Sequence, residues 1–108
     1  MKRIPILLLL VAVALLSAPA AIADAGPDGT VIFKAKCAMC HGPDGKGQTA
    51  MGKNLHLRDM GSDEVQNMKN ADMQKMIADG KGKMPAFKEK LDQASIDALI
   101  GFIRTLKK

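Results

Sequence analysis

The chain contains no tryptophan and no tyrosine, and its three phenylalanines are the only aromatic residues among 108. Large aliphatic side chains are also scarce outside the N-terminal segment. After residue 23, leucine, isoleucine, valine and phenylalanine together make up 15 of 85 residues. A chain this short and this poor in large apolar residues cannot easily build a core of its own, which excludes a multidomain enzyme. We expect a small domain whose core is completed by a cofactor or a covalent staple.

The charges do not form long runs of one sign. There are 16 lysines and arginines against 11 acidic residues, and no basic run is longer than two residues. Because no aromatic residues are interleaved with the basic ones, the sequence does not indicate nucleic-acid binding. No segment repeats, and none alternates convincingly with period two. We therefore expect an all-α domain with almost no sheet.

The longest apolar run lies at the N-terminus and is typical of a secretory signal peptide. Residues 1–3 are positively charged, residues 6–16 are unbroken apolar, and residues 21–23 have the small-residue pattern of a cleavage site. We expect cleavage before Asp24 and a single domain over 24–108, with no stable membrane insertion. An uncleaved anchor is the alternative. Export implies the periplasm or an equivalent compartment such as a thylakoid lumen, and the mature chain carries a net charge of +3.

The segment Cys37-Ala38-Met39-Cys40-His41 contains both cysteines and one of the two histidines. Two cysteines three residues apart and followed at once by histidine are the attachment signature of c-type haem. Residues i and i+3 share one face of a helix, so both thiols can reach the two vinyl groups along one edge of a porphyrin. His41 then provides an imidazole as axial ligand. The cofactor would also supply the missing core, so the haem-free chain should be largely unfolded.

Three other interpretations of the cysteine pair are weaker. A thioredoxin-type redox pair would need a βαβ pattern, which is not visible. A zinc site needs four ligands, and the chain offers Cys37, Cys40, His41 and His56 without a second pair. A structural disulfide would account for neither His41 nor the missing core.

Met84 is the candidate for the second axial ligand. It follows a glycine that would end a helix, and Pro85 favours an extended backbone at Met84, so its thioether can cross the haem face opposite His41. Met60 and His56 remain alternatives. Other methionines are more typical of packing, and Met73, Met76 and Ile77 recur at helical spacing as a face against the haem edge.

Together these segments resemble the class I c-type cytochromes, small soluble carriers with one haem. The resemblance covers about residues 26–107. It rests on four segments. The first contains Gly29, Phe33, Cys37, Cys40, His41 and Gly42, and the others are Asn54-Leu55, Met84-Pro85-Ala86-Phe87 and a final helix. It implies an all-α cytochrome c fold in which three to five helices surround one haem, attached covalently by two thioether bonds.

The resemblance also implies a crossing of the first and last helices, at which Gly29 and Phe33 would meet Leu99 and Phe102. Gly101 either eases this approach or merely weakens the last helix. In many relatives a proline stands at the position of Lys53, and its carbonyl accepts a hydrogen bond from the axial histidine. The Lys53 carbonyl can still accept this bond. The tryptophan and tyrosine that bind a haem propionate in mitochondrial members are absent. The sequence leaves Arg58, Gln48 or a lysine for that role.

Capping residues and apolar spacing predict the helices. Asp28 should cap a helix from 29 to about 39, residues 42–52 should form a loop, and Ser62 should cap a short helix. Asn70 should cap a further helix that ends at Gly80, and the last helix should start at Asp92 or Ser95. Its apolar face consists of Ile96, Leu99, Ile100, Ile103 and Leu106.

The predicted function is one-electron transfer between larger redox proteins by a monomeric carrier that is not an enzyme. An iron with histidine and methionine ligands has no open position for a substrate. The alternatives are a dedicated electron-accepting subunit of one dehydrogenase or oxidase, and a peroxidase-like or gas-sensing protein from which Met84 detaches. Lysines near the haem-binding segments would steer docking onto an acidic partner. They are Lys34, Lys36, Lys46, Lys53, Lys81, Lys83 and Lys88.

Overall fold

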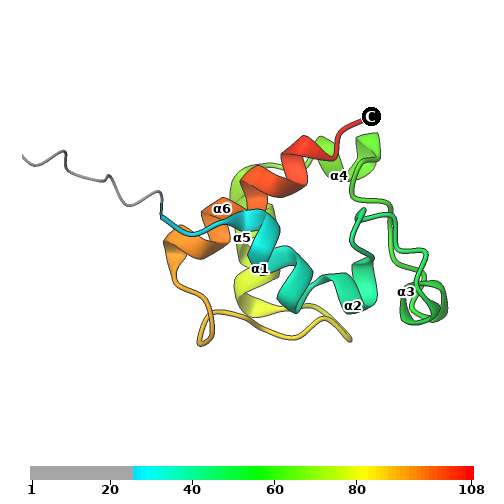
Figure 1. Cartoon of the computed structure of the whole chain (residues 1–108), viewed down its shortest axis with the longest axis horizontal. Coiled ribbons are helices and arrows are strands. Elements are labelled where there is room, and N and C mark those ends of the chain that lie inside the picture. The colour runs from blue at the N-terminus through cyan, green and yellow to red at the C-terminus, as the bar shows by residue number, and fades with distance from the viewer. Residues whose placement is uncertain (1–25) are drawn as a thin grey trace, which may run out of the picture.

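The computed structural model describes residues 26–108, so the predicted signal peptide and its cleavage site lie outside the described residues. Residues 26–108 form six helical segments, two of them single turns (Figure 1). Their bounds are α1 (Gly29–Lys36), α2 (Ala38–His41), α3 (Ala50–Asn54), α4 (Asp63–Gln66), α5 (Asn70–Asp79) and α6 (Gln93–Thr105). In this part of the chain the sole β pairing is an isolated bridge between Lys81 and Met84. The all-α expectation is confirmed.

Side-chain caps explain where most helices begin. Asp28 accepts hydrogen bonds from the backbone of the first turn of α1, as Ser62 does for α4 and Asp92 for α6. The caps at Asp28 and Ser62 were predicted, and Asp92 was one of the two starts expected for α6. The predicted extent of α5 is close to that observed, but its predicted cap was wrong, because Lys69 stands at the cap position and Asn70 is the first residue of the helix.

The first helix is shorter than predicted. It ends at Lys36, and Cys37 stands between α1 and α2, so the expected single helix to about residue 39 is divided in two. The Cys37 carbonyl accepts hydrogen bonds from the amides of Cys40 and His41, at 3.2 and 2.9 Å. This division and the unpredicted α3 raise the number of helical segments above the expected three to five.

Helices α1 and α6 cross in direct backbone contact. A Cβ atom at Gly29 would overlap the carbonyl oxygen of Ala98, so only glycine permits this approach. Phe33 and Leu99 are fully buried at the crossing, and the Phe33 ring lies 4.8 Å from that of Phe102, centroid to centroid. The crossing of the N- and C-terminal helices is therefore confirmed.

Gly101 plays no part in this contact, because nothing lies within 4 Å of a Cβ placed there. The sequence left two interpretations of Gly101 open, and the structure supports the one in which this glycine merely lowers the stability of α6.

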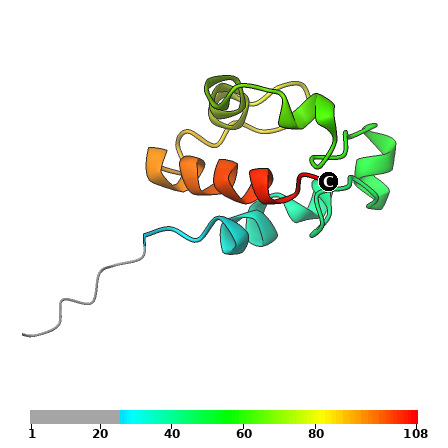
Figure 2. The same ribbon diagram turned by 90° about the horizontal axis from the view of Figure 1, so that it is seen from above.

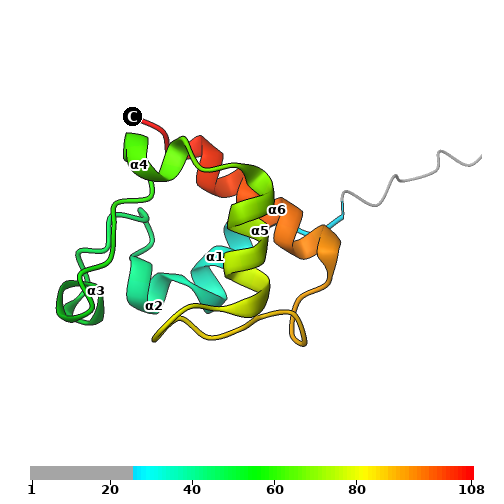
Figure 3. The same cartoon turned by 180° about the vertical axis from the view of Figure 1, so that it is seen from behind.

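Helix α6 lies between α1 on one side and α5 on the other, as the view from above shows (Figure 2). Its predicted apolar face is buried at four positions, and Leu106 at its end is half-buried. Seen from behind, α5 packs over α6, while α2 and α3 lie together beyond the crossing (Figure 3). The buried core consists of Phe33, Val65, Met73, Ile77, Phe87, Leu91, Ile96, Leu99, Ile100 and Ile103.

Side chains at the end of α6 hold the segment between α3 and α5. The Arg104 guanidinium donates to the carbonyl oxygens of Gln66 (2.6 Å) and Met68 (2.5 Å) and to the Asn70 side chain (2.7 Å). The Gln66 amide in turn donates to the carbonyls of Met60 and Ile103, at 2.7 and 2.9 Å. Helix α6 thereby fixes the path of a chain segment that has little regular structure of its own.

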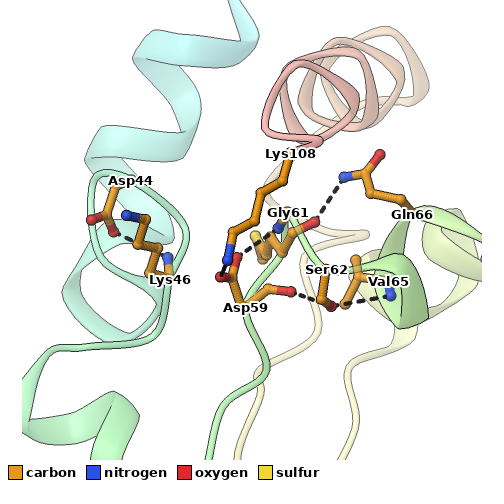
Figure 4. A network of polar contacts seen from close by, with 9 residues as sticks. Asp44, Lys46, Asp59, Gly61, Ser62, Val65, Gln66 and Lys108 are labelled. Atoms are coloured by element: carbon orange, nitrogen blue, oxygen red, sulfur yellow. Dashed lines mark hydrogen bonds and ion pairs between the residues drawn. The ribbon is translucent and has the colours of Figure 1, made fainter.

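The C-terminal residue closes the same region (Figure 4). The ammonium group of Lys108 lies 2.5 Å from one carboxylate oxygen of Asp59, and the other accepts a hydrogen bond from the amide of Gly61 at 2.8 Å. No helix within 26–108 has the length and apolar character needed to cross a membrane.

Candidate cofactor site

The two cysteines lie on the wall of a cavity of about 410 Å³. Cys37 separates α1 from α2, Cys40 lies one turn later, and both thiols are half-buried and unbridged. Burial raises the pKa of the Cys37 thiol to about 11, so this thiol stays protonated at neutral pH. Redox cysteines normally react as thiolates, so a thioredoxin-type pair is not favoured.

The zinc alternative lacks the required cluster of metal-ligating side chains. Across residues 26–108, no three histidine, cysteine or acidic side chains converge as metal ligands would. His56 and the cysteine pair lie on different cavities, since His56 does not line the one that the thiols share.

His41 is the last residue of α2 and lies on the wall of both this cavity and a second one of about 210 Å³. Burial lowers the pKa of its imidazole, which favours the neutral form. The buried Nδ1 atom has no hydrogen-bond partner within the described part of the chain. The bond that we expected from this ring to the Lys53 carbonyl is therefore not formed in this structure.

Met84 is presented by a tight turn. The backbones of Lys81 and Met84 exchange two hydrogen bonds, of 3.1 and 2.9 Å, across a turn that includes Gly82 with φ = 56°. Gly80 also has a positive φ, and a Cβ atom there would lie 2.6 Å from the Met84 carbonyl oxygen. Two glycines thus allow the loop to fold back and bring Met84 onto both cavities.

The second cavity is lined mainly by thioether and aliphatic groups. Met73 and Ile77 contribute from buried positions of α5, and Met76 also lines it, as the predicted packing face requires. Met60 and His56, the alternatives to Met84, lie on the same wall. Of these three candidates, Met84 alone lines both of the cavities that His41 lines.

Basic side chains stand on the exposed edges of the two cavities. Arg58 and Lys81 line the smaller one, and Lys36, Lys81 and Lys83 line the larger one. No carboxylate belongs to either lining. Gln48 lines neither cavity, and nor do the remaining lysines of the predicted group, Lys34, Lys46, Lys53 and Lys88.

Sequence reasoning missed helix α3, which was predicted as part of a loop. The Thr49 hydroxyl accepts a hydrogen bond from the Gly52 amide and donates one to the Cys40 carbonyl at 2.7 Å. It thereby joins α3 to the cysteine segment. A threonine three residues before a backbone donor is a recognisable cap signal, but four glycines between 42 and 52 obscured it. Leu57, on the wall of both cavities, was also missed.

The residues present fit a haem. An apolar interior with basic edges matches a porphyrin that carries two carboxylates, and two thiols, a half-buried imidazole and a thioether line the same space. The buried Nδ1 atom of His41 has no partner among the described residues, and because an unsatisfied buried polar atom costs about 1–3 kcal/mol, the protein atoms described do not complete this site by themselves.

Comparisons with known proteins agree with this description. The family model described as "Cytochrome C oxidase, cbb3-type, subunit III" matches residues 24–103. The cbb3-type cytochrome c oxidase subunit FixP of Azorhizobium caulinodans is 37% identical over 86 residues, which cover 76% of this chain and 27% of that protein. The chain therefore spans just over a quarter of the length of this curated relative.

Solved structures show the same fold. The KustC0563 c-type cytochrome is 32% identical with a TM-score of 0.70, over 75% of this chain and 99% of the other. Cytochrome c6C from Synechococcus sp. PCC 7002 is 31% identical with a TM-score of 0.54, over 71% and 90%.

Proposed function

Because the chain belongs to the c-type cytochrome family described as subunit III of cbb3-type cytochrome c oxidase, we propose that it is a periplasmic one-electron carrier. Cys37 and Cys40 attach the haem, and His41 and Met84 bind its iron. The observation that carries this assignment is that His41 and Met84 both line the two cavities, one of which also contains the two thiols. Members of this family are electron carriers and typically not enzymes.

The haem, when bound, supplies an iron that is stable in two oxidation states one electron apart. The chain's own side chains position it. Two thioether bonds from Cys37 and Cys40 would restrict its rotation and translation, since α2 carries Cys40 and His41 and Cys37 stands at its N-cap position. The neutral imidazole of His41 has the protonation state that metal binding requires.

The turn over 81–84 supports Met84 as the ligand that faces His41. Met84 is half-buried, whereas His56 is exposed, and neither His56 nor Met60 lines the cavity that contains the thiols. Met84 lines both cavities, as His41 does, so both side chains would be available to hold the iron. Methionine ligation also favours reduced iron, which raises the potential and suits a carrier.

The oxidised optical spectrum tests the ligand assignment. We expect a low-spin spectrum with the methionine-to-iron charge-transfer band, lost in Met84→Ala and retained in Met60→Ala, the matched control from the same cavity wall. Loss of the band in Met60→Ala with its retention in Met84→Ala would overturn the assignment. High-spin iron in the unaltered protein would instead favour the peroxidase-like or gas-sensing alternative.

Three lysines support docking to an acidic partner. Lys36, Lys81 and Lys83 are exposed and line the larger cavity, where the haem edge would meet a partner protein. Exposed charges of one sign speed association, and salt screens this effect over about 10 Å at 0.1 M ionic strength. Reduction by an acidic redox protein should therefore slow as salt rises, and this slowing should weaken in Lys83→Gln. Salt-independent kinetics would contradict the proposal.

The family match favours a second candidate, a haem-bearing electron-entry subunit of a cbb3-type oxidase. This chain corresponds to only part of the FixP relative, so the oxidase role is a separate proposal. Purification of the native protein from membranes distinguishes the two. Stoichiometric recovery with an oxidase favours the subunit, and recovery of a monomer from the periplasmic fraction favours the free carrier.

A further inference from the structure

His56 has an unusual backbone conformation. Its φ is 52°, and it is the one residue other than glycine with a positive φ in the part of the chain that the structure describes. The left-handed region brings Cβ close to the carbonyl oxygen, so it is unfavourable for any residue with a side chain.

The end of helix α3 imposes this conformation. The His56 amide donates to the Lys53 carbonyl at 3.2 Å, and the Leu57 amide donates to the Gly52 carbonyl at 2.9 Å. These two bonds form the Schellman arrangement that commonly ends a helix, in which the residue at the position of His56 is usually glycine. Histidine at this point costs stability that glycine would not. Strain of this kind is typically found where a side chain serves a ligand.

The His56 side chain belongs to the smaller cavity. It lines this space together with Arg58, two residues later, and Lys81 from the turn that presents Met84. The rest of the lining is aliphatic or thioether, apart from the imidazole of His41. A space that is apolar within, basic at its edge and free of carboxylates fits an apolar molecule with acidic groups on one side.

Arg58 can contact such a group without losing its present partner. Its Nη1 atom lies 3.0 Å from a carboxylate oxygen of Glu64, and the side chains are 44% and 68% exposed, respectively. Glu64 therefore engages one terminal nitrogen of a group that has five N–H donors, and the fork geometry suits a second carboxylate.

We infer that His56 and Arg58 bind the propionate carboxylates of the haem, an inference that rests on the haem site proposed above. His56 donates a hydrogen bond from its ring to one carboxylate, and Arg58 pairs with a carboxylate through its guanidinium. The strained backbone at His56 keeps the imidazole at the edge of the cavity, where a glycine would leave the carboxylate to water.

The charged and titratable groups that face His56 across this cavity are His41, Arg58 and Lys81. A positive charge beside the haem disfavours ferric iron and so raises the reduction potential. A hydrogen bond from His56 to a carboxylate and the positive charge of Arg58 should therefore both raise the potential.

Redox titration of the holoprotein tests the inference, with the optical spectrum recorded alongside. His56→Gly relieves the backbone strain and removes the ring, so it should lower the potential because one carboxylate loses its hydrogen-bond donor. His56→Asn tolerates the same backbone and keeps a side-chain donor, so it should lower the potential less. Arg58→Met should also lower the potential, and by more than the control Lys34→Met, an exposed lysine outside both linings.

The possible results separate this inference from the proposed function. Unchanged potentials in His56→Gly and Arg58→Met, with a low-spin spectrum and a raised unfolding midpoint in His56→Gly, would overturn the inference and leave the iron ligands intact. Loss of the low-spin spectrum in His56→Gly would identify His56 as an iron ligand, which would overturn both the inference and the assignment of Met84.

Discussion

The crossing of α1 and α6 and the region around the two cavities are built in different ways. At the crossing, protein atoms meet protein atoms, with Phe33 and Leu99 fully buried and Gly29 against a backbone carbonyl. Around the cavities, the thiols are half-buried and a buried nitrogen of His41 has no partner among the described residues. Side chains thus complete the core at the crossing, while the cavities leave the space that the proposed haem would fill.

Among single substitutions, the largest effect is expected at the crossing itself. Gly29→Ala places a methyl group onto the Ala98 carbonyl, which the two helices can relieve only by moving apart. Overpacking of this kind costs about 3 kcal/mol. Denaturant unfolding of the holoprotein measures the loss, and an unchanged midpoint would show that the helices are not in backbone contact.

Arg104 joins the two regions and should have the next largest effect. Arg104→Met keeps the length of the side chain but leaves the carbonyls of Gln66 and Met68 without their donor. Loss of such charge-assisted bonds should lower the free energy of unfolding by about 1–3 kcal/mol. The same denaturant titration checks this value. Wild-type stability in Arg104→Met would mean that α6 does not hold the segment leading into α5.

The pair of Asp59 and Lys108 predicts a smaller, pH-dependent effect. The hydrogen bond from Lys108, then that from the Gly61 amide, lowers the pKa of the Asp59 carboxyl below its ordinary value. The pair therefore stabilises the fold above the unfolded-state pKa of about 3.9 and loses this contribution as pH falls through the folded-state pKa.

Thermal unfolding of the holoprotein between pH 2 and 6 measures this effect. The wild type should be more stable than Asp59→Asn at pH 6, and the difference should shrink as the solution becomes more acidic. A difference that stays constant with pH would exclude this ion pair as its source.

Gly101 should show the smallest effect, and with the opposite sign. No atom lies within 4 Å of a Cβ placed there, and the residue is exposed in the middle of α6. Gly101→Ala should stabilise the protein by about 0.5–1 kcal/mol, because alanine favours the helix. It is also the matched control for Gly29→Ala. Destabilisation by Gly101→Ala would mean that this face of α6 is covered.

The starts of the helices could be predicted from the residues better than the cavity region, whereas the crossing of α1 and α6 was expected only from the family resemblance. Asp28, Ser62 and Asp92 cap their helices through bonds to residues two or three positions away, so their signals are local. The role of Asn70 was missed because Arg104, which binds it, lies 34 residues further along. No local pattern reports such a contact.

The cavity region depends on backbone details that residue types do not reveal. The sequence motif predicted that Cys37, Cys40 and His41 would act together, and the structure places all three on one cavity. The sequence did not reveal that Cys37 would interrupt the first helix or that His56 would take a left-handed conformation. Both follow from how short segments pack around a space that side chains leave open.

Unfolding of the protein without its cofactor tests this account most directly. The double variant Cys37→Ser/Cys40→Ser, prepared without haem, should be compared with the holoprotein by far-ultraviolet circular dichroism during heating. We expect one cooperative transition in the holoprotein and weak helicity without a cooperative transition in the haem-free variant. A fully helical haem-free variant that melts cooperatively would contradict the claim that the haem forms the missing part of the core.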